Sequence, residues 1–130
     1  MEREMFHEDL FGEIDGKVFL LGKQCPKCGN IQFPQKGFCQ KCLNENMTDL
    51  QIGARGKLFS YTTTYGRVDR RKGPFDVGYI QLEEGIRVFA PIRKEEEQVY
   101  QIGQEMELEI VDLWEEDEII KTGYGYKVVE

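Results

Sequence analysis

Four cysteines constrain this chain more than any other feature. Cys25, Cys28, Cys39 and Cys42 form two Cys-x-x-Cys pairs separated by ten residues. Each pair can form a tight turn with backbone amides pointing at the sulfurs, and two facing turns place four thiolates at the corners of a tetrahedron, as Zn²⁺ prefers. Gly29, directly after the first pair, readily adopts the positive φ of a chain reversal. The spacing predicts a rubredoxin-like zinc ribbon over residues 25–46, holding one zinc ion per chain.

Four cysteines can also serve other chemistry. Two disulfides would suit a secreted protein, but the acidic opening of the chain is not typical of a signal peptide. A thioredoxin-like redox site needs one pair on a βαβ unit rather than two pairs close together. A mononuclear iron site with the same sulfurs stays open. Because four protein sulfurs leave no coordination position for activating water, the metal is expected to be structural.

Composition limits the classes of protein to which this chain can belong. The chain has 130 residues with 17 Lys+Arg and 24 Asp+Glu, a formal net charge of −7, and its longest fully apolar run has four residues, from Val18 to Leu21. A membrane-spanning helix needs about twenty apolar residues, so we expect a cytoplasmic protein without a membrane anchor. The sequence pI near 4.9 speaks against a general nucleic-acid binder, which would need a basic face.

The regions on either side of the ribbon follow different patterns. In residues 1–24, Phe6, Leu10 and Ile14 recur at helical spacing, which predicts an amphipathic helix followed by a lead-in strand at 17–24. Residues 47–130 alternate short β-type runs with turn residues, so the chain is expected to be mainly β, with a C-terminal five-stranded OB-fold barrel. The predicted barrel strands are Gly56–Tyr65, Gly78–Leu82, Arg87–Ile92, Glu105–Leu113 and Lys121–Val129.

No set of catalytic residues is evident from the sequence. The single histidine is His7, the single serine is Ser60 in a predicted strand, and neither lies in a nucleophile motif. Zinc would occupy all four cysteines, and Gly123-Tyr-Gly125 lacks the spacing of a dinucleotide-binding loop. We therefore expect a protein that performs no chemistry itself.

Residues 66–74 form a basic segment in an otherwise acidic protein. Arg67, Arg70, Arg71 and Lys72 carry four positive charges against one negative charge, between two predicted strands. Such a segment can be a solvated, mobile loop, or it can contact phosphates or an acidic partner surface. The aromatic residues that flank it could be core residues or could stack on a flat ring; they are Phe59, Tyr61, Tyr65, Phe75 and Tyr79.

The order of these parts resembles a known family. The phrases that carry the resemblance are "CPKCGNIQFPQKGFCQKC", "GKLFSYTTTYGR", "GPFDVGYIQLEEGIRVFAPI" and "YQIGQEMELEIVD". They are similar to those of the small zinc-ribbon/OB-fold proteins long catalogued as a domain of unknown function, whose members accompany thiolases, hydroxymethylglutaryl-CoA synthases and related acyl-CoA enzymes. The resemblance covers about Phe6 to Val129. Gln35-Lys36 departs from the family's proline and arginine after Phe33-Pro34, which puts any role of that arginine in doubt here.

The resemblance implies a non-catalytic subunit that binds a thiolase-fold enzyme in a hetero-oligomer and helps to hold the CoA ester. It also implies that Cys25, Cys28, Cys39 and Cys42 are the metal ligands. Among such partners it favours a degradative thiolase, such as the benzoylsuccinyl-CoA thiolase of anaerobic toluene breakdown. A scaffold for hydroxymethylglutaryl-CoA synthesis or an aldolase-associated subunit fits almost equally well.

Two hypotheses of other classes stay open. Ribbons and OB barrels also bind single-stranded nucleic acid, although the region after Met47 has 11 basic against 17 acidic residues. An enzyme acting on an acyl-CoA through carboxylates is the third hypothesis, which turnover by the isolated chain would establish.

Overall fold

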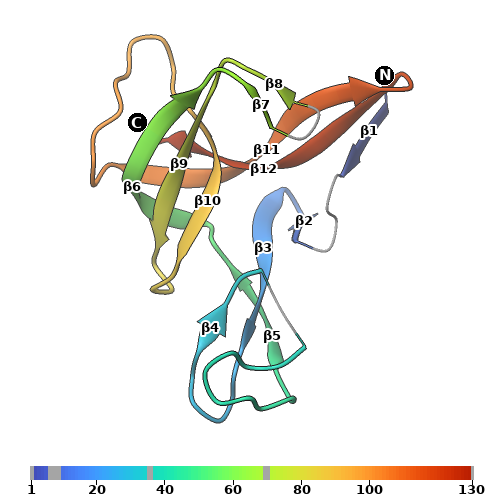
Figure 1. The fold of residues 1–130 in the computed structure, drawn as a ribbon, viewed down its shortest axis with the longest axis vertical. Coiled ribbons are helices and arrows are strands. Elements are labelled where there is room, and N and C mark those ends of the chain that lie inside the picture. Colours follow the sequence, from blue (N-terminus) through green and yellow to red (C-terminus); the bar gives the residue numbers. More distant parts are fainter. Residues whose placement is uncertain (1, 6–9, 35–36, 69–70, 130) are drawn as a thin grey trace.

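A computed structural model describes residues 2–5, 10–34, 37–68 and 71–129, and all the regular elements in these ranges are strands. They form a barrel and a smaller zinc-ribbon part, which lies below the barrel in Figure 1. In chain order the strands are β1 (Glu2–Met5), β2 (Phe11–Ile14), β3 (Lys17–Gln24), β4 (Ile31–Gln32), β5 (Thr48–Ile52), β6 (Arg55–Thr64), β7 (Arg67–Val68), β8 (Arg71–Lys72), β9 (Phe75–Leu82), β10 (Arg87–Arg93), β11 (Glu105–Glu116) and β12 (Ile119–Val128).

The barrel has five strands and closes on itself. The order runs β12-β10-β9-β6-β11, and β11 also pairs with β12, so the predicted five-stranded barrel is confirmed and is closed. On β11, Met106 and Leu108 are buried, while Glu107 between them and Glu109 after them lie partly exposed on the opposite face, as the alternation of a strand requires. Register shifts at Phe59 in β6 and at Leu113 in β11 mark irregularities where these long strands bend around the barrel.

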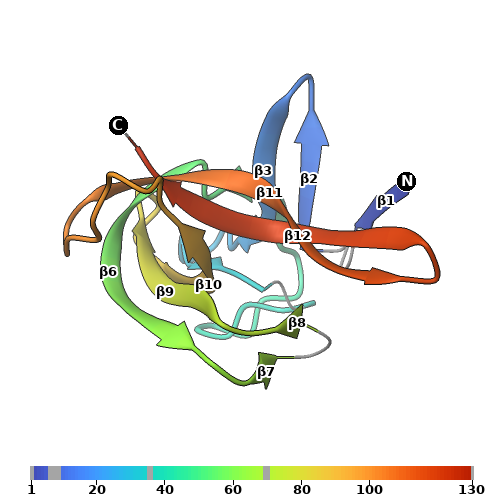
Figure 2. The same ribbon diagram turned by 90° about the horizontal axis from the view of Figure 1, so that it is seen from above.

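The β11–β12 hairpin is longer than the barrel needs and projects beyond it (Figure 2). Its turn consists of Asp117 and Glu118, which both have positive φ values of 53° and 63°, as in a two-residue turn that matches the strand twist. Near this turn β1 adds to β12 as a parallel strand, from Glu2 opposite Ile119 to Met5 opposite Thr122. The N-terminus is thereby joined to the projecting end of the hairpin.

The predicted N-terminal helix is wrong. Glu2–Met5 and Phe11–Ile14 are strands, and β2 forms an antiparallel hairpin with β3. The deciding signal is the turn at Asp15-Gly16, where φ is 51° and 79°, because two positive φ values close a tight hairpin and cannot continue a helix. Ile14, placed on the apolar stripe of the helix, is 56% exposed, and Phe6 lies outside the described residues.

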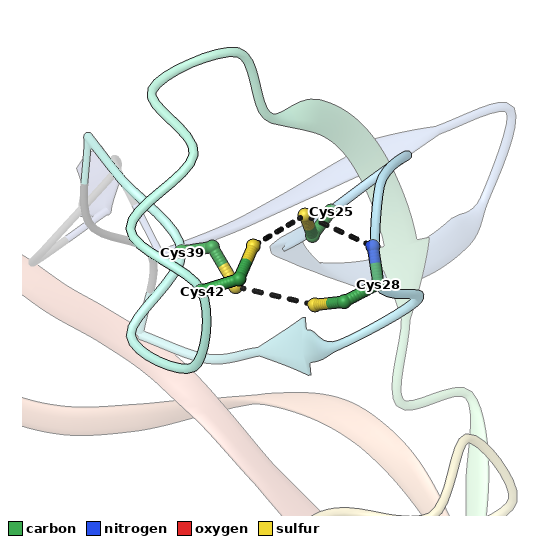
Figure 3. A group of neighbouring side chains, drawn as sticks. All are labelled: Cys25, Cys28, Cys39 and Cys42. Carbon is green, nitrogen blue, oxygen red and sulfur yellow. Dashed lines mark hydrogen bonds between the residues drawn. The ribbon is translucent and has the colours of Figure 1, made fainter.

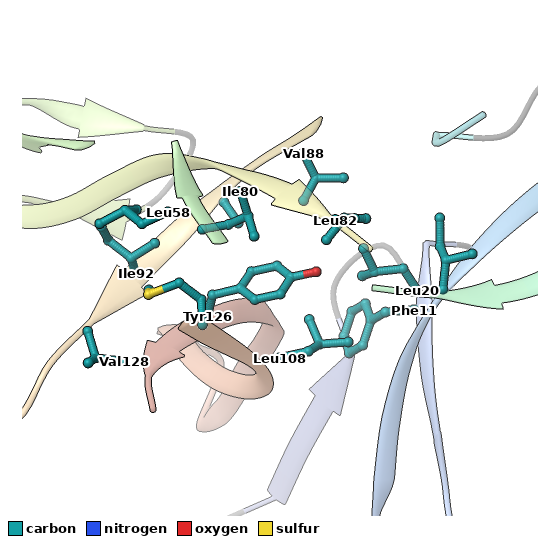
Figure 4. Close-up of a cluster of buried hydrophobic side chains, with 13 residues drawn as sticks. Phe11, Leu20, Leu58, Ile80, Leu82, Val88, Ile92, Leu108, Tyr126 and Val128 are labelled. Atoms are coloured by element: carbon teal, nitrogen blue, oxygen red, sulfur yellow. The ribbon is translucent and has the colours of Figure 1, made fainter. Parts of the chain in front are cut away.

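A single hydrophobic core connects the barrel to the strands that lead into and out of the ribbon. Phe11, Leu20 and Ile52 belong to the same buried cluster as the barrel residues, with Tyr126 between the two groups (Figure 4). The Tyr126 hydroxyl donates a 2.7 Å hydrogen bond to the carbonyl of Gly53. Gly53 has a φ of 85°, and a Cβ there would lie 2.8 Å from that hydroxyl, so this contact requires glycine.

Among the described residues, no helix is long and apolar enough to cross a membrane.

Candidate metal centre and surface sites

The two cysteine pairs fold into two similar knuckles that face each other (Figure 3). In the first, the Gly29 N–H donates to the Cys25 carbonyl at 2.8 Å, and in the second the Leu43 N–H donates to the Cys39 carbonyl at the same distance. Gly29 and Leu43 both have left-handed backbones, with φ of 81° and 66°. Each four-residue turn therefore reverses directly after its second cysteine, which brings both sulfurs of the pair to one side.

The four sulfurs form one compact cluster. They lie within 4.8 Å of one another, with Cys25 Sγ 3.5 Å from Cys42 Sγ and Cys28 Sγ 3.6 Å from Cys39 Sγ. Zinc–sulfur bonds of about 2.3 Å in a tetrahedron place neighbouring sulfurs about 3.8 Å apart. The cluster therefore matches the size of a four-thiolate zinc site, with the sulfurs all free of disulfides.

Hydrogen bonds to the two buried sulfurs favour the ionised form that a metal needs, whereas at Cys42 the hydrogen bond from the Asn44 backbone is outweighed by the neighbouring thiols and by burial, which raise the pKa to about 12. Burial opposes ionisation of Cys25, but hydrogen bonds from the backbone N–H of Cys28, the Asn44 side chain and the backbone of Lys27 outweigh it and lower the pKa of Cys25 to about 6. The pKa of Cys39 is also lowered, because hydrogen bonds from the Cys42 and Lys41 backbones overcome its burial. Since thiolates bind zinc, this environment prepares the two buried cysteines for the metal.

Two asparagines support the cluster, and the sequence analysis missed them. The amide of Asn30 lies 3.7 Å from Cys39 Sγ, and the amide of Asn44 lies 3.6 Å from Cys25 Sγ. Each knuckle thus supplies an amide donor to a sulfur of the opposite knuckle, an outer-shell contact that orients ligands. The signal was present as a repeated Cys-x-x-Cys-x-Asn pattern, in Cys25–Asn30 and again in Cys39–Asn44.

Gln32, which is 5% exposed, connects β4 to the loop that carries the second knuckle. Its side-chain oxygen accepts from the Gln40 backbone N–H at 3.1 Å, and its amide donates to the Phe38 carbonyl at 2.8 Å. These bonds satisfy a buried polar side chain and hold β4 against the loop that carries the second knuckle.

The structure brings two of the predicted basic residues together and places a third on the opposite face of the same hairpin. Arg67 and Lys72 are partners across the two-stranded β7–β8 hairpin, and both are exposed. Arg71, next to Lys72, points to the other face because side chains alternate along a strand. There its guanidinium lies 4.2 Å above the ring of Phe75. Arg70 lies outside the described residues, and the segment predicted as a plain loop contains this hairpin.

An aromatic face covers the outside of β6, β9 and β10. We define it by Phe59, Tyr79 and Phe89, which are 46%, 45% and 51% exposed. Tyr79 and Phe89 are cross-strand partners with ring centroids 5.1 Å apart, and Arg87 places its guanidinium 3.8 Å above Phe59. Phe59 and Tyr79 were flagged from the sequence as either core or stacking residues; both lie on the surface.

Comparisons with known proteins agree with this architecture. A family domain described as "ChsH2, rubredoxin-like zinc ribbon domain" matches residues 20–48, and "ChsH2, C-terminal OB-fold domain" matches residues 50–111. The chain is 32% identical to a DUF35 domain-containing scaffold protein of Methanothermobacter thermautotrophicus, over 88% of both chains. The chain belongs to the DUF35 family. Together with the cluster of four sulfurs, the ribbon match confirms a structural zinc ion as the cofactor.

Other relatives and solved structures extend this result. The DUF35 chain is 36% identical to the benzoylsuccinyl-CoA thiolase subunit BbsA of Thauera aromatica, over 67% of this chain but only 62% of that relative's length. The corresponding subunit of Geobacter metallireducens is 30% identical, over 79% of this chain and 70% of that one. A structure described as the Ltp2-ChsH2(DUF35) aldolase shares the fold with a TM-score of 0.65 at 17% identity, covering 85% of this chain and 84% of that one.

Proposed function

We propose that this DUF35 chain is a non-catalytic accessory subunit that binds a thiolase-fold catalytic subunit and contributes to holding the CoA ester. The observation that carries the proposal is the similarity to proteins named as thiolase subunits and scaffold proteins, which extends over most of the chain. The likeness to a structure described as an aldolase with a DUF35 component shows the shared fold.

The side-chain chemistry supports a non-catalytic role. We propose Cys25, Cys28, Cys39 and Cys42 as the four zinc ligands, which leaves no free thiol as a nucleophile and no open metal position for water. When bound, zinc crosslinks the two knuckles. Ser60 lies within β6, and His7 lies outside the described residues. The nucleophile and the general base would therefore come from the partner.

We further propose that the aromatic face contacts the catalytic subunit. Protein interfaces concentrate their binding energy in a few buried aromatic and arginine side chains, and Phe59, Tyr79, Phe89 and Arg87 form such a group on the surface. A stable contact would bury on the order of 1,600 Å² in total. Phe59, Tyr79 and Phe89, whose side chains are about half exposed in the isolated chain, would lie at the centre of this interface.

A degradative thiolase is the favoured partner. The specific substrate that the relatives suggest is benzoylsuccinyl-CoA, because the chain is 36% identical to a subunit of benzoylsuccinyl-CoA thiolase. A scaffold that bridges two acyl-CoA enzymes is the second candidate, favoured by the scaffold proteins that match over 88% of both chains. One catalytic partner in the purified complex would support the first candidate, and two different enzymes would support the second.

The test is purification of the tagged full-length chain from its native cells, followed by mass spectrometry. We expect a thiolase-fold protein in near-stoichiometric amount. Recovery of the chain alone, or with nucleic acid, would overturn the accessory role. Phe89→Ser should abolish co-purification, whereas Ile102→Ser, which changes an even more exposed apolar residue outside the aromatic face, should not. If Phe89→Ser retains the partner, only the proposed contact surface is wrong.

A further inference from the structure

A polar pocket opens where β8, β1, β10 and β11 meet, away from both the metal centre and the aromatic face. Its volume is about 380 Å³. Three arginines from three different strands line it, namely Arg3, Arg71 and Arg93, together with the carboxylates of Glu109 and Asp112. The lining itself carries three positive and two negative charges, and a third carboxylate, that of Glu95, binds Arg93 from outside the lining.

Two of the arginines have carboxylate partners. Arg3 Nε and Nη2 donate to the two oxygens of Asp112 at 3.1 and 3.2 Å. Arg93 Nε donates to Glu109 at 2.6 Å, and its Nη1 donates to Glu95 at 3.1 Å. Both pairs fix a guanidinium at the wall of the pocket and neutralise it.

Among the described residues, Arg71 is the arginine of this pocket that has no carboxylate partner. Its Nη1 is buried and has no hydrogen-bond partner in the part of the chain that the structure describes. Burial lowers the pKa of Arg71, and the ring of Phe75 beneath its guanidinium offers only a cation–π contact. Buried polar groups are almost always satisfied, so an orphan donor on a partly buried cation indicates an acceptor that the described residues do not supply.

We propose that this pocket binds a phosphate group of a small molecule, with the Arg71 guanidinium as its main contact. A guanidinium presents its donors in a fixed fork that matches phosphate oxygens. A phosphate dianion would neutralise Arg71 and still attract the neighbouring Arg3 and Arg93, which a single carboxylate charge does less well. The site does not depend on the proposed accessory function, since it lies within one chain and needs no partner.

The test is titration of the zinc-loaded full-length chain with inorganic phosphate, pyrophosphate and acetate at constant low ionic strength, followed by calorimetry and amide NMR shifts. The variants are Arg71→Gln and, as a matched control, Lys72→Gln. Both remove one positive charge from β8, but Lys72 is exposed on the other face and does not line the pocket. Both side chains lie on a surface hairpin, and thermal melting checks that each variant is folded.

We expect saturable binding of phosphate and pyrophosphate and weaker binding of acetate. Arg71→Gln should weaken phosphate binding on the order of 10- to 100-fold, as the loss of a charged hydrogen bond predicts, and Lys72→Gln should change it less than about twofold, as for a screened surface charge. Three results would overturn the proposal: no saturable phosphate binding by the unmodified chain, equal losses in both variants, or acetate binding as tight as phosphate binding.

Discussion

In the barrel the buried side chains are apolar apart from Thr122 and the hydroxyl of Tyr126, whereas in the described ribbon between residues 25 and 46 they are Cys25, Cys39 and Gln32. The barrel buries Leu58, Ile80 and Met106 almost completely on strands that pair around a closed circle. Apart from residues 35–36, which the structure does not describe, the ribbon has one two-residue strand, β4, and otherwise consists of turns, bends and irregular chain. Too little apolar surface is buried there to offset the entropy of ordering the chain.

The contrast shows how two parts of one small chain can have different sources of stability. The barrel derives its stability from apolar burial, and the ribbon depends on metal–thiolate bonds that exist only when zinc is present. The parts are joined by Tyr126, which bonds to Gly53, and by Tyr124, which contacts Phe11 and Phe33 edge-on at 5.9 and 5.8 Å.

Removal of zinc should have the largest effect, and it should be confined to the ribbon. Structural zinc in small ribbons contributes about 10–16 kcal/mol of apparent folding free energy, while the barrel core contains no metal ligand. After chelation, hydrogen exchange should lose protection at residues 25–46 and keep it in β9 and β10. Simultaneous loss of protection in both parts would show that the shared tyrosine contacts make them one cooperative unit.

Ile80→Ala should weaken the barrel and leave the ribbon loaded with metal. Ile80 is fully buried, and truncation of such a residue costs about 2–5 kcal/mol. Urea unfolding should show this loss, while metal analysis of the folded protein still finds one zinc per chain. Gln81→Ala, at the neighbouring outward position of β9, is the control and should have a small effect. Loss of zinc from native Ile80→Ala would contradict the separation.

Tyr126→Phe should weaken the connection between the two parts by a smaller amount. It removes the hydroxyl and leaves the carbonyl of Gly53 unpaired in the core, which costs about 1–3 kcal/mol. Equilibrium unfolding measures the loss. Tyr79→Phe removes a hydroxyl from a residue that is 45% exposed and serves as the matched control. An equal effect of the two substitutions would mean that the buried hydrogen bond has no special role.

Leu43→Gly should stabilise the ribbon, the smallest of these effects. Leu43 has a φ of 66° and is 69% exposed, so glycine removes backbone strain of about 1 kcal/mol and loses little buried surface. The variant should retain zinc against a competing chelator at higher chelator concentrations than the unmodified chain. Gly29→Ala, at the equivalent position of the other knuckle, should shift the same measurement in the opposite direction.

Local signals predicted most of the fold. Five barrel strands were placed within three residues of their observed ends, as is usual for element boundaries. The domain boundaries after residues 24 and 46 stay predictions. The N-terminal helix failed because apolar spacing in a short segment cannot distinguish a helix from a strand, and a tight turn at Asp15-Gly16 outweighed it.

What the sequence by itself determined is the metal centre and the alternation of the strands, because both depend on residues close together in the chain. A knuckle is complete within six residues, and a strand face repeats every second residue. What only the tertiary structure decided is the closure of the barrel, the aromatic face and the arginine pocket. Arg3, Arg71 and Arg93 meet there because the parallel pairing of β1 with β12 and the path of β8 bring distant segments together, and no local spacing encodes such a meeting.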